Sequence, residues 1–216
     1  MKDEYFRIRD HCRKGLLKYL AKAFSIVPEL ERPAILDIGC GTGVPTLWLA
    51  ENCTGTITAV DIDRESIEWL RKKISVRKFE NRINALNLSF SDVGSAFAPF
   101  DIILAEGFLN VVGFGKGFPK LIGMLKKGGH FIVHDEYRDH ERKCDFIRKQ
   151  GCELLHSFVL DEKVWWRDYY KLLETEINAV KIKGIRDLFK NDRKEIELYK
   201  RDPVPFRSAY YIVKKG

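Results

Sequence analysis

Three glycines at alternate positions after an apolar run constrain this chain more than any other feature of its sequence. Residues 34–38 are mostly apolar and predict a buried strand. Gly39, Gly41 and Gly43 follow, and residues 44–50 predict the start of a helix. A strand that passes through a glycine-rich turn into a helix holds anionic or nucleotide-like ligands against exposed backbone N–H groups. Glycine is needed there because a side chain would block the ligand and because some turn positions require a positive φ.

The spacing of these glycines narrows the choice of ligand. Dinucleotide-binding turns use G-x-G-x-x-G, and Val44 stands where the third glycine would be. The sequence D-I-G-C-G-T-G of residues 37–43 instead resembles the first motif of the class I S-adenosylmethionine (SAM) methyltransferases. A structural glycine turn in another α/β domain is the alternative. The resemblance implies that SAM is the cofactor and that the turn contacts it through Asp37, Gly39, Cys40, Gly41 and Gly43.

A carboxylate ends the second apolar run. Residues 57–60 predict a strand, and Asp61 follows about twenty residues beyond the glycine turn. The resemblance implies that Asp61 accepts hydrogen bonds from both ribose hydroxyls and that Ile62 packs against the adenine. Asp63 precedes a helical pattern over residues 64–78, so we expect it to cap that helix.

A third predicted strand, residues 83–88, leads to another candidate contact. Family members commonly place an acidic residue after this strand, where it bonds the adenine amino group. The resemblance therefore implies cofactor contacts from Ser91, Asp92 and Val93. An ordinary turn is the alternative, since aspartate and glycine are frequent turn residues.

Strand and helix patterns alternate along the chain, which predicts a parallel sheet with helices on both faces. The expected strands are residues 33–38, 56–61, 83–88, 100–105, 129–134, 153–160 and 208–214. The expected helices before residue 161 are residues 6–23, 44–50, 64–78, 118–125 and 141–149. We therefore predict an α/β, Rossmann-like class I methyltransferase fold with a mostly parallel seven-stranded sheet, in a single domain spanning residues 1–216.

About forty-five residues separate the last two predicted strands, far more than a hairpin loop requires. Within them, residues 161–201 show helical periodicity, with Lys183-Gly184 as a predicted helix stop and a second helix over residues 185–199. Four aromatic residues fall within six positions, and aromatic faces suit an apolar or cationic methyl acceptor. We expect a lid over the active site that contacts the acceptor through Trp165, Trp166, Tyr169 and Tyr170. Simple docking of a helix onto the domain is the alternative.

Glu106-Gly107 at the end of the fourth predicted strand and the L-K-K-G-G turn of residues 125–129 add to the resemblance. Together with the Trp/Tyr cluster of residues 165–170, they resemble the small-molecule methyltransferases grouped with ubiquinone/menaquinone-biosynthesis enzymes. The resemblance extends from the glycine turn to this cluster. It identifies a relative and not a substrate.

Two side chains are candidates for a catalytic role. Glu106 could stabilise the sulfonium side of the cofactor, bind the acceptor or act as a base, or it could simply cap the next turn. His134 leaves the fifth predicted strand at the same edge and could be a general base near neutral pH, or a packed core residue. His130 lies four strand residues away, at about 13 Å, which is too far to share a metal ion. We therefore expect no metal.

Composition and charge bear on partners and compartment. No apolar stretch approaches the roughly twenty residues that span a bilayer, and residues 1–4 lack the apolar core of a secretory signal. Five cysteines without a C-x-x-C pair predict free thiols in a reducing compartment, and thus a cytoplasmic protein.

The net charge of +7 raises nucleic acid as a partner. Basic and acidic residues are mixed throughout, however, and no base-flipping motif follows the fourth predicted strand, which disfavours nucleic acid. We predict direct in-line methyl transfer from SAM to a small-molecule acceptor. An RNA-modifying methyltransferase and a SAM-binding protein without turnover are the alternatives, and the oligomeric state is left open.

Overall fold

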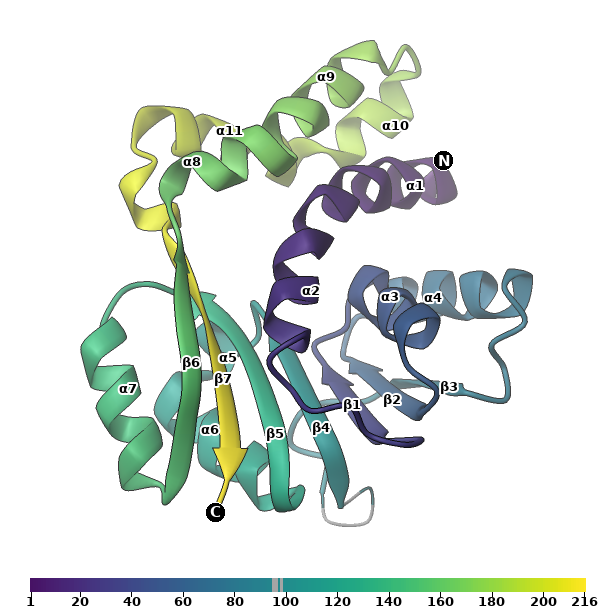
Figure 1. Cartoon of the computed structure of the whole chain (residues 1–216). Coiled ribbons are helices and arrows are strands. Elements are labelled where there is room, and N and C mark those ends of the chain that lie inside the picture. The colour runs from purple at the N-terminus through teal and green to yellow at the C-terminus, as the bar shows by residue number, and fades with distance from the viewer. Residues whose placement is uncertain (95–96, 98) are drawn as a thin grey trace.

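The computed structural model describes residues 1–94, 97 and 99–216. In these residues seven strands form one sheet in the order β3-β2-β1-β4-β5-β7-β6 (Figure 1). The strands are β1 (Ala34–Ile38), β2 (Thr56–Asp61), β3 (Ile83–Asn87), β4 (Phe100–Glu106), β5 (Leu125–Glu136), β6 (Cys152–Leu160) and β7 (Ser208–Lys215). β7 runs antiparallel to both of its neighbours, and the pairs from β3 to β5 are parallel. The predicted seven-stranded, mostly parallel sheet is confirmed.

Helices cover both faces of the sheet, as expected (Figure 1). One face carries α1 (Lys2–Arg13), α2 (Leu17–Phe24), α3 (Val44–Asn52) and α4 (Arg64–Val76). The other carries α5 (Leu109–Val112), α6 (Phe114–Gly123) and α7 (His140–Lys149). Successive strand residues point to opposite faces, so that Ile35 lies in one apolar cluster and Leu36 in the other. None of the helices in the described part of the chain is long and apolar enough to cross a membrane.

The prediction of one continuous helix over residues 6–23 is wrong in the middle of that range. A 3-10 turn, Lys14–Leu16, separates α1 from α2. At its centre, Gly15 lies so close to the insertion that a Cβ would be 2.1 Å from the Asp168 carbonyl oxygen. Glycine is also a poor helix former. A tertiary contact therefore sets this break, and the local apolar pattern does not reveal it.

The predicted turn over residues 125–129 is also wrong, because these residues lie within β5. Gly128 there has a φ of +73°, and the pairing between β4 and β5 shifts register between Phe100 and Ile102. The glycines that predicted a turn therefore distort β5 but do not interrupt it.

Residues 161–201 are helical, as predicted. They form α8 (Glu162–Trp165), a π-helical turn (Trp166–Tyr170), α9 (Lys171–Ala179), α10 (Lys183–Leu188) and α11 (Lys190–Arg201), and a 3-10 turn (Val204–Phe206) leads into β7. The predicted stop at Lys183-Gly184 is wrong, because Lys183 begins α10. The single helix expected over residues 185–199 is two helices joined at Phe189. The side chain of Phe189 is fully buried and packs on Tyr5 of α1, at 4.8 Å between ring centroids, which fixes the bend there.

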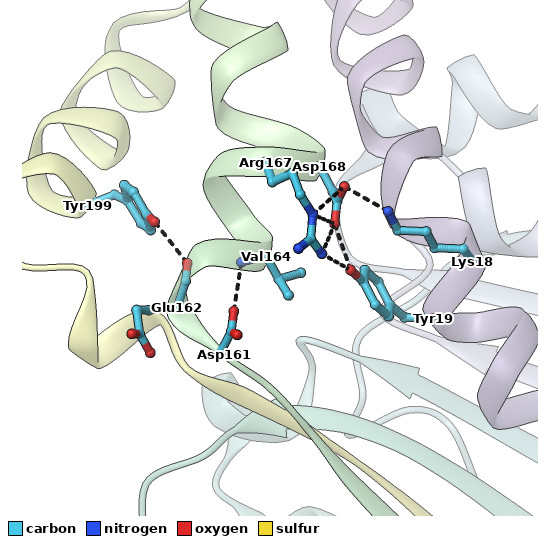
Figure 2. A network of polar contacts seen from close by, with 8 residues as sticks. All are labelled: Lys18, Tyr19, Asp161, Glu162, Val164, Arg167, Asp168 and Tyr199. Carbon is cyan, nitrogen blue, oxygen red and sulfur yellow. Dashed lines mark hydrogen bonds and ion pairs between the residues drawn. The ribbon is translucent and has the colours of Figure 1, made fainter.

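These helices, residues 161–201, are called the insertion below. In Figure 1 the insertion crosses above the sheet, with α9 and α10 next to α1. Figure 2 shows its attachment to α2: the Asp168 carboxylate accepts hydrogen bonds from Lys18 Nζ (2.7 Å) and from the Tyr19 hydroxyl (2.6 Å). Asp161 caps α8 through the Val164 N–H (3.2 Å). The insertion is therefore fastened to the N-terminal helices.

Candidate functional site

The glycine turn has the backbone that the sequence predicts. The φ angles of Gly39, Gly41 and Gly43 are +71°, +52° and +79°. A Cβ on Gly43 would lie 2.3 Å from the Leu70 side chain, whereas a Cβ on Gly41 would meet nothing within 4 Å. Close packing thus requires glycine at position 43, whereas Gly41 borders the open space of a cavity.

Asp61 joins the end of β2 to this turn. Its Oδ2 accepts a hydrogen bond from Gly41 N (2.7 Å), and its Oδ1 accepts one from Asp63 N (2.8 Å). Asp63 itself accepts a hydrogen bond from Glu65 N at the start of α4, which confirms its predicted role as the helix cap. The Asp61 carboxylate is therefore held in place by two backbone groups.

A cavity of about 370 Å³, which we call the β2 cavity, adjoins Asp61. Ile62 lines it and is 73% exposed, and the other walls are largely apolar. Gly39, Phe90 and Phe108 are among these walls. An exposed isoleucine beside apolar walls makes a surface suited to a flat, partly apolar ligand group.

Ser91, Asp92 and Val93 lie next to the β2 cavity but outside its lining, where Ser89 and Phe90 are found instead. Val93 is fully buried in the core, and Asp92 is exposed. A turn closed by a hydrogen bond from Asp92 N to Ser89 O (3.0 Å) brings the earlier residues to the cavity. A cofactor contact from residues 91–93 stays a prediction.

A smaller cavity of about 190 Å³, the turn cavity, is also lined by the glycine turn and shares Gly39 with the β2 cavity. The turn lines it with Asp37, Gly39, Cys40, Gly41 and Thr42. Arg9, Asp10 and Arg13 of α1 line it as well. Sequence analysis did not identify these three, since charged residues on a helix of ordinary periodicity match no motif.

Asp10 holds α1 against the glycine turn and α4. Its Oδ1 accepts a hydrogen bond from the Thr42 hydroxyl (2.5 Å), and its Oδ2 accepts one from Trp69 Nε1 (2.9 Å). Lys73 adds an ion pair to the same carboxylate. The position of α1 over the cavity therefore depends on a buried, charge-compensated aspartate.

Asp37 and Cys40 are both buried in the turn. Desolvation raises the pKa of Asp37 to about 7, against the opposing effect of a hydrogen bond from the Thr46 hydroxyl (2.5 Å). Burial also raises the pKa of the Cys40 thiol well above its usual value. The thiol is therefore neutral and unreactive, and the turn presents backbone groups to its cavity.

Glu106 at the end of β4 is surrounded by polar partners. Its side chain is 9% exposed, its Oε2 accepts a hydrogen bond from Arg13 Nη2 (3.2 Å), and its Oε1 accepts one from the Tyr210 hydroxyl. Arg13 and Glu106 line both the turn cavity and a third cavity of about 490 Å³, the insertion cavity. The two cavities therefore meet at this ion pair.

His134 lies in the lining of the insertion cavity. Its Nε2 is 2.9 Å from Ser208 Oγ, and its ring lies between those of Tyr210 (4.4 Å) and Trp165 (6.0 Å). Desolvation lowers its pKa to about 4. The imidazole is thus neutral at physiological pH and a weak proton acceptor.

The four aromatic residues that were predicted to contact the acceptor lie in three different places. Trp165 and Tyr170 line the insertion cavity, and Tyr169 lines the turn cavity together with Gly41 and Glu106. Trp166 lines neither, and its ring stacks on that of Tyr199 (5.9 Å, 8°). The insertion therefore lies at the same edge of the sheet as the glycine turn and Glu106, and Trp166 packs within the insertion.

Two residues of the insertion cavity have a buried polar atom that forms no hydrogen bond to any residue the structure describes. These atoms are Asp135 Oδ1 and Trp165 Nε1. The other carboxylate oxygen of Asp135 is 2.6 Å from Lys143 Nζ. Among the described residues, no group of three or more His, Cys, Asp and Glu side chains is arranged to bind a metal ion.

Comparison with known proteins shows a similarity to methyltransferases over part of the chain. Residues 35–129 match a family model described as a methyltransferase domain. Ribosomal protein L11 methyltransferase from Ruminiclostridium cellulolyticum is 26% identical over 132 residues, which are 60% of this chain and 41% of that protein. The chain thus spans less than half the length of this relative.

Solved structures share the fold. The cyclopropane synthase MmaA2 from Mycobacterium tuberculosis has a TM-score of 0.77 at 14% identity, covering 92% of this chain and 84% of that one. An O-methyltransferase from Brevibacillus brevis, in complex with S-adenosyl-L-homocysteine, has a TM-score of 0.59 at 15% identity, covering 85% and 66%. At these identities the likeness concerns the fold.

Proposed function

We propose that this chain, whose residues 35–129 carry a methyltransferase domain with SAM as its cofactor, is an enzyme that methylates a small molecule. The observation that carries the proposal is the junction of two cavities at Arg13 and Glu106. One cavity contains the glycine turn, and the other contains the aromatic side chains of the insertion. A cofactor in the first and an acceptor in the second would be adjacent at this junction.

The residues around the glycine turn fit the parts of the cofactor. Asp61 supplies carboxylate oxygens for the ribose hydroxyls, and Ile62 and Phe90 supply apolar surface for the adenine. Arg9 brings a guanidinium group, which suits a carboxylate, into the turn cavity. Since a Cβ at Gly41 would meet nothing within 4 Å, the backbone there leaves room for a ligand.

Bound SAM supplies a methyl group on a positively charged sulfur. The protein's part is to align the acceptor with that methyl group and to exclude water, which can supply most of the rate without an acid–base residue. The low pKa of His134 supports such a mechanism, because a buried neutral imidazole with a pKa of about 4 takes up protons weakly. We propose that Glu106 and His134 orient the two ligands.

We propose that the insertion is the lid of this site. Tyr169 contributes to the turn cavity, and Trp165 and Tyr170 contribute to the insertion cavity. Both cavities would therefore lose a wall if the insertion moved away. Closure by such a segment would exclude water from the methyl transfer.

The size of the insertion cavity supports a small acceptor. Its volume of about 490 Å³ falls within the range of ligand pockets.

All five cysteines are free, which supports the proposed cytoplasmic location, where thiols stay reduced.

Transfer of methyl-labelled SAM into a fractionated cell extract tests this proposal. The protein is incubated separately with the metabolite, RNA and protein fractions, and the label in each fraction is counted. We expect label in the metabolite fraction, and at least about tenfold less with Trp165→Ala, because truncating the indole removes an acceptor-side wall. Label in RNA or protein alone, or in no fraction, would overturn the proposal.

A further inference from the structure

We propose that the methyl acceptor carries an amine or ammonium group and that Glu195 selects for its positive charge. The proposal rests on the function given above, since it names the class of molecule that the insertion cavity takes. It follows from three features of that cavity: its charges, its aromatic walls and a buried carboxylate oxygen without a partner.

Glu195 of α11 is an exposed carboxylate in the lining that has no cationic partner among the described residues. The other charged lining residues pair with opposite charges: Arg13 with Glu106 (3.2 Å), Asp135 with Lys143 (2.6 Å), Glu136 with Arg138 (3.3 Å) and Arg207 with Glu162 (3.9 Å). Glu195 forms no ion pair with any residue that the structure describes. Its Oε1 accepts a hydrogen bond from the Tyr170 hydroxyl (2.8 Å), which holds the carboxylate at the cavity. The cavity therefore has one excess negative charge.

Aromatic rings stand beside this charge. The Tyr170 ring is 5.9 Å from that of Trp165, at 30°, and 5.9 Å from that of Phe206, at 88°. All three residues line the insertion cavity. Tryptophan, tyrosine and phenylalanine faces attract cations, and quaternary ammonium groups are bound in this way. A carboxylate next to several aromatic faces is thus suited to an organic cation.

Asp135 provides an independent indication of a hydrogen-bond donor. Its side chain is 1% exposed, and its Oδ1 forms no hydrogen bond in the described part of the chain. A buried acceptor without a partner costs free energy, which a ligand N–H would recover. Trp165 Nε1, likewise buried and without a partner, would be satisfied by an oxygen on the same ligand. A compound with an amine and an oxygen would meet both needs.

The same features disfavour other classes of acceptor. A carboxylate or phosphate would need a free cation, but Arg13 and Arg207 each have a carboxylate partner. An apolar acceptor would gain nothing from the Glu195 carboxylate, which is exposed and has no cationic partner among the described residues. A cation is the class that compensates the cavity.

A pair of compounds with the same shape tests the proposal. Choline and 3,3-dimethylbutan-1-ol have the same branching and hydroxyl group and differ in the positive charge. Both are titrated into the full-length protein by calorimetry, with and without saturating S-adenosylhomocysteine. We expect choline to bind at least about tenfold more tightly, because charge is the only large difference between the two.

Two matched variants assign the preference to Glu195. Glu195→Gln keeps the shape and the hydrogen bond to Tyr170 but removes the charge, so the preference should fall to about threefold or less. Glu197→Gln removes a charge from the same helix outside the cavity lining and should leave the preference unchanged. Equal binding of the two compounds, no binding of either, or a preference that survives Glu195→Gln would overturn the proposal.

The titration also separates this proposal from the proposed function. Binding of S-adenosylhomocysteine is measured on the same samples. If it binds and choline has no advantage, only the amine class is wrong. If it does not bind, the function fails, and the choline preference of the cofactor-free protein still decides whether the cavity selects cations.

Discussion

Asp61 is the residue on which cofactor affinity should depend most directly. Its carboxylate is oriented by the N–H groups of Gly41 and Asp63, at 2.7 and 2.8 Å, and lines the β2 cavity. We expect micromolar binding of SAM and of S-adenosylhomocysteine. Asp61→Ala should weaken both by at least about tenfold, because hydrogen bonds to a charged group are worth roughly 1.5–3 kcal/mol. Calorimetry measures the change.

The neighbouring aspartate provides the control. Asp63→Ala removes the hydrogen bond that caps α4, which should cost about 1 kcal/mol of stability but leave cofactor affinity unchanged. If a folded Asp61→Ala protein binds the cofactor as tightly as the unchanged protein, Asp61 has been assigned the wrong role.

His134 should make stability depend on pH. Burial lowers its pKa from 6.5 to about 4, so the unfolded chain binds a proton more readily than the folded protein. The neutral folded form is therefore favoured above pH 6.5, and this contribution is lost as the pH falls from 6.5 to about 4. The difference corresponds to about 3 kcal/mol.

The variant His134→Gln isolates this effect. Asp37 titrates in an overlapping range with the opposite sign, because its raised pKa of about 7 makes the folded protein lose stability as the pH rises. We therefore compare urea unfolding of the two proteins from pH 4 to pH 7. The unfolding free energy of the unchanged protein minus that of His134→Gln should increase as the pH rises. A difference that does not change with pH would contradict a buried neutral imidazole.

Sequence patterns and tertiary structure identify different residues of the site. Gly39, Gly41 and Asp61 follow from a motif of nearby residues, because backbone geometry and strand order set their places. Arg13 and Tyr210 meet at Glu106 from opposite ends of the chain, and neither lies in a recognisable motif. Such long-range partners depend on how whole elements pack.

At the scale of elements, the 3-10 turn between α1 and α2 packs closely against the insertion. A Cβ on Gly15 would lie 2.1 Å from the Asp168 carbonyl oxygen. Gly15→Ala should therefore push the two elements apart and cost about 1–3 kcal/mol, as overpacking does. The Tm and the rate of hydrogen exchange in residues 162–170 measure the change.

Gly123→Ala is the control, since a Cβ there would meet nothing within 4 Å. It should leave the Tm near that of the unchanged protein. Equal stability and exchange in the two variants would show that the contact at Gly15 does not hold the insertion.

The insertion should open more readily than the sheet if it is a lid. Segments that gate a site come from the less stable parts of a fold. Hydrogen exchange should show residues 161–201 exchanging faster than β1 and β4 in the free protein, and more slowly when cofactor and acceptor are bound. Exchange that is unaffected by either ligand would identify the insertion as a fixed part of the core.

Element positions were predictable where apolar alternation is strong and local. All seven strands were expected close to their observed positions. The helix breaks at Gly15 and Phe189 were not, because each is set by a contact with a distant element. The inclusion of residues 125–129 in β5 was missed for a related reason, since the pairing of Leu125 with Phe100 of β4 extends the strand across two glycines that would otherwise turn it.

At the scale of the whole molecule, strand order determines where the site lies. β1 lies between β2 and β4, so the strand order reverses there and the segments that follow the carboxyl ends of β1 and β4 diverge. Ligands bind at such a point in open α/β sheets. Asp37, Asp61 and Glu106 all lie at or near these strand ends. The alternating pattern predicted this sheet and a first helix, but it did not show that α1 completes the turn cavity.

We propose that cofactor and acceptor meet at Arg13 and Glu106. A crystal structure of the protein with bound S-adenosylhomocysteine would show whether they do. We predict the adenosine in the β2 cavity against Ile62, the amino acid part in the turn cavity, and the sulfur facing Glu106 and the insertion cavity. A ligand bound elsewhere, or a sulfur that faces away from the insertion cavity, would contradict this account.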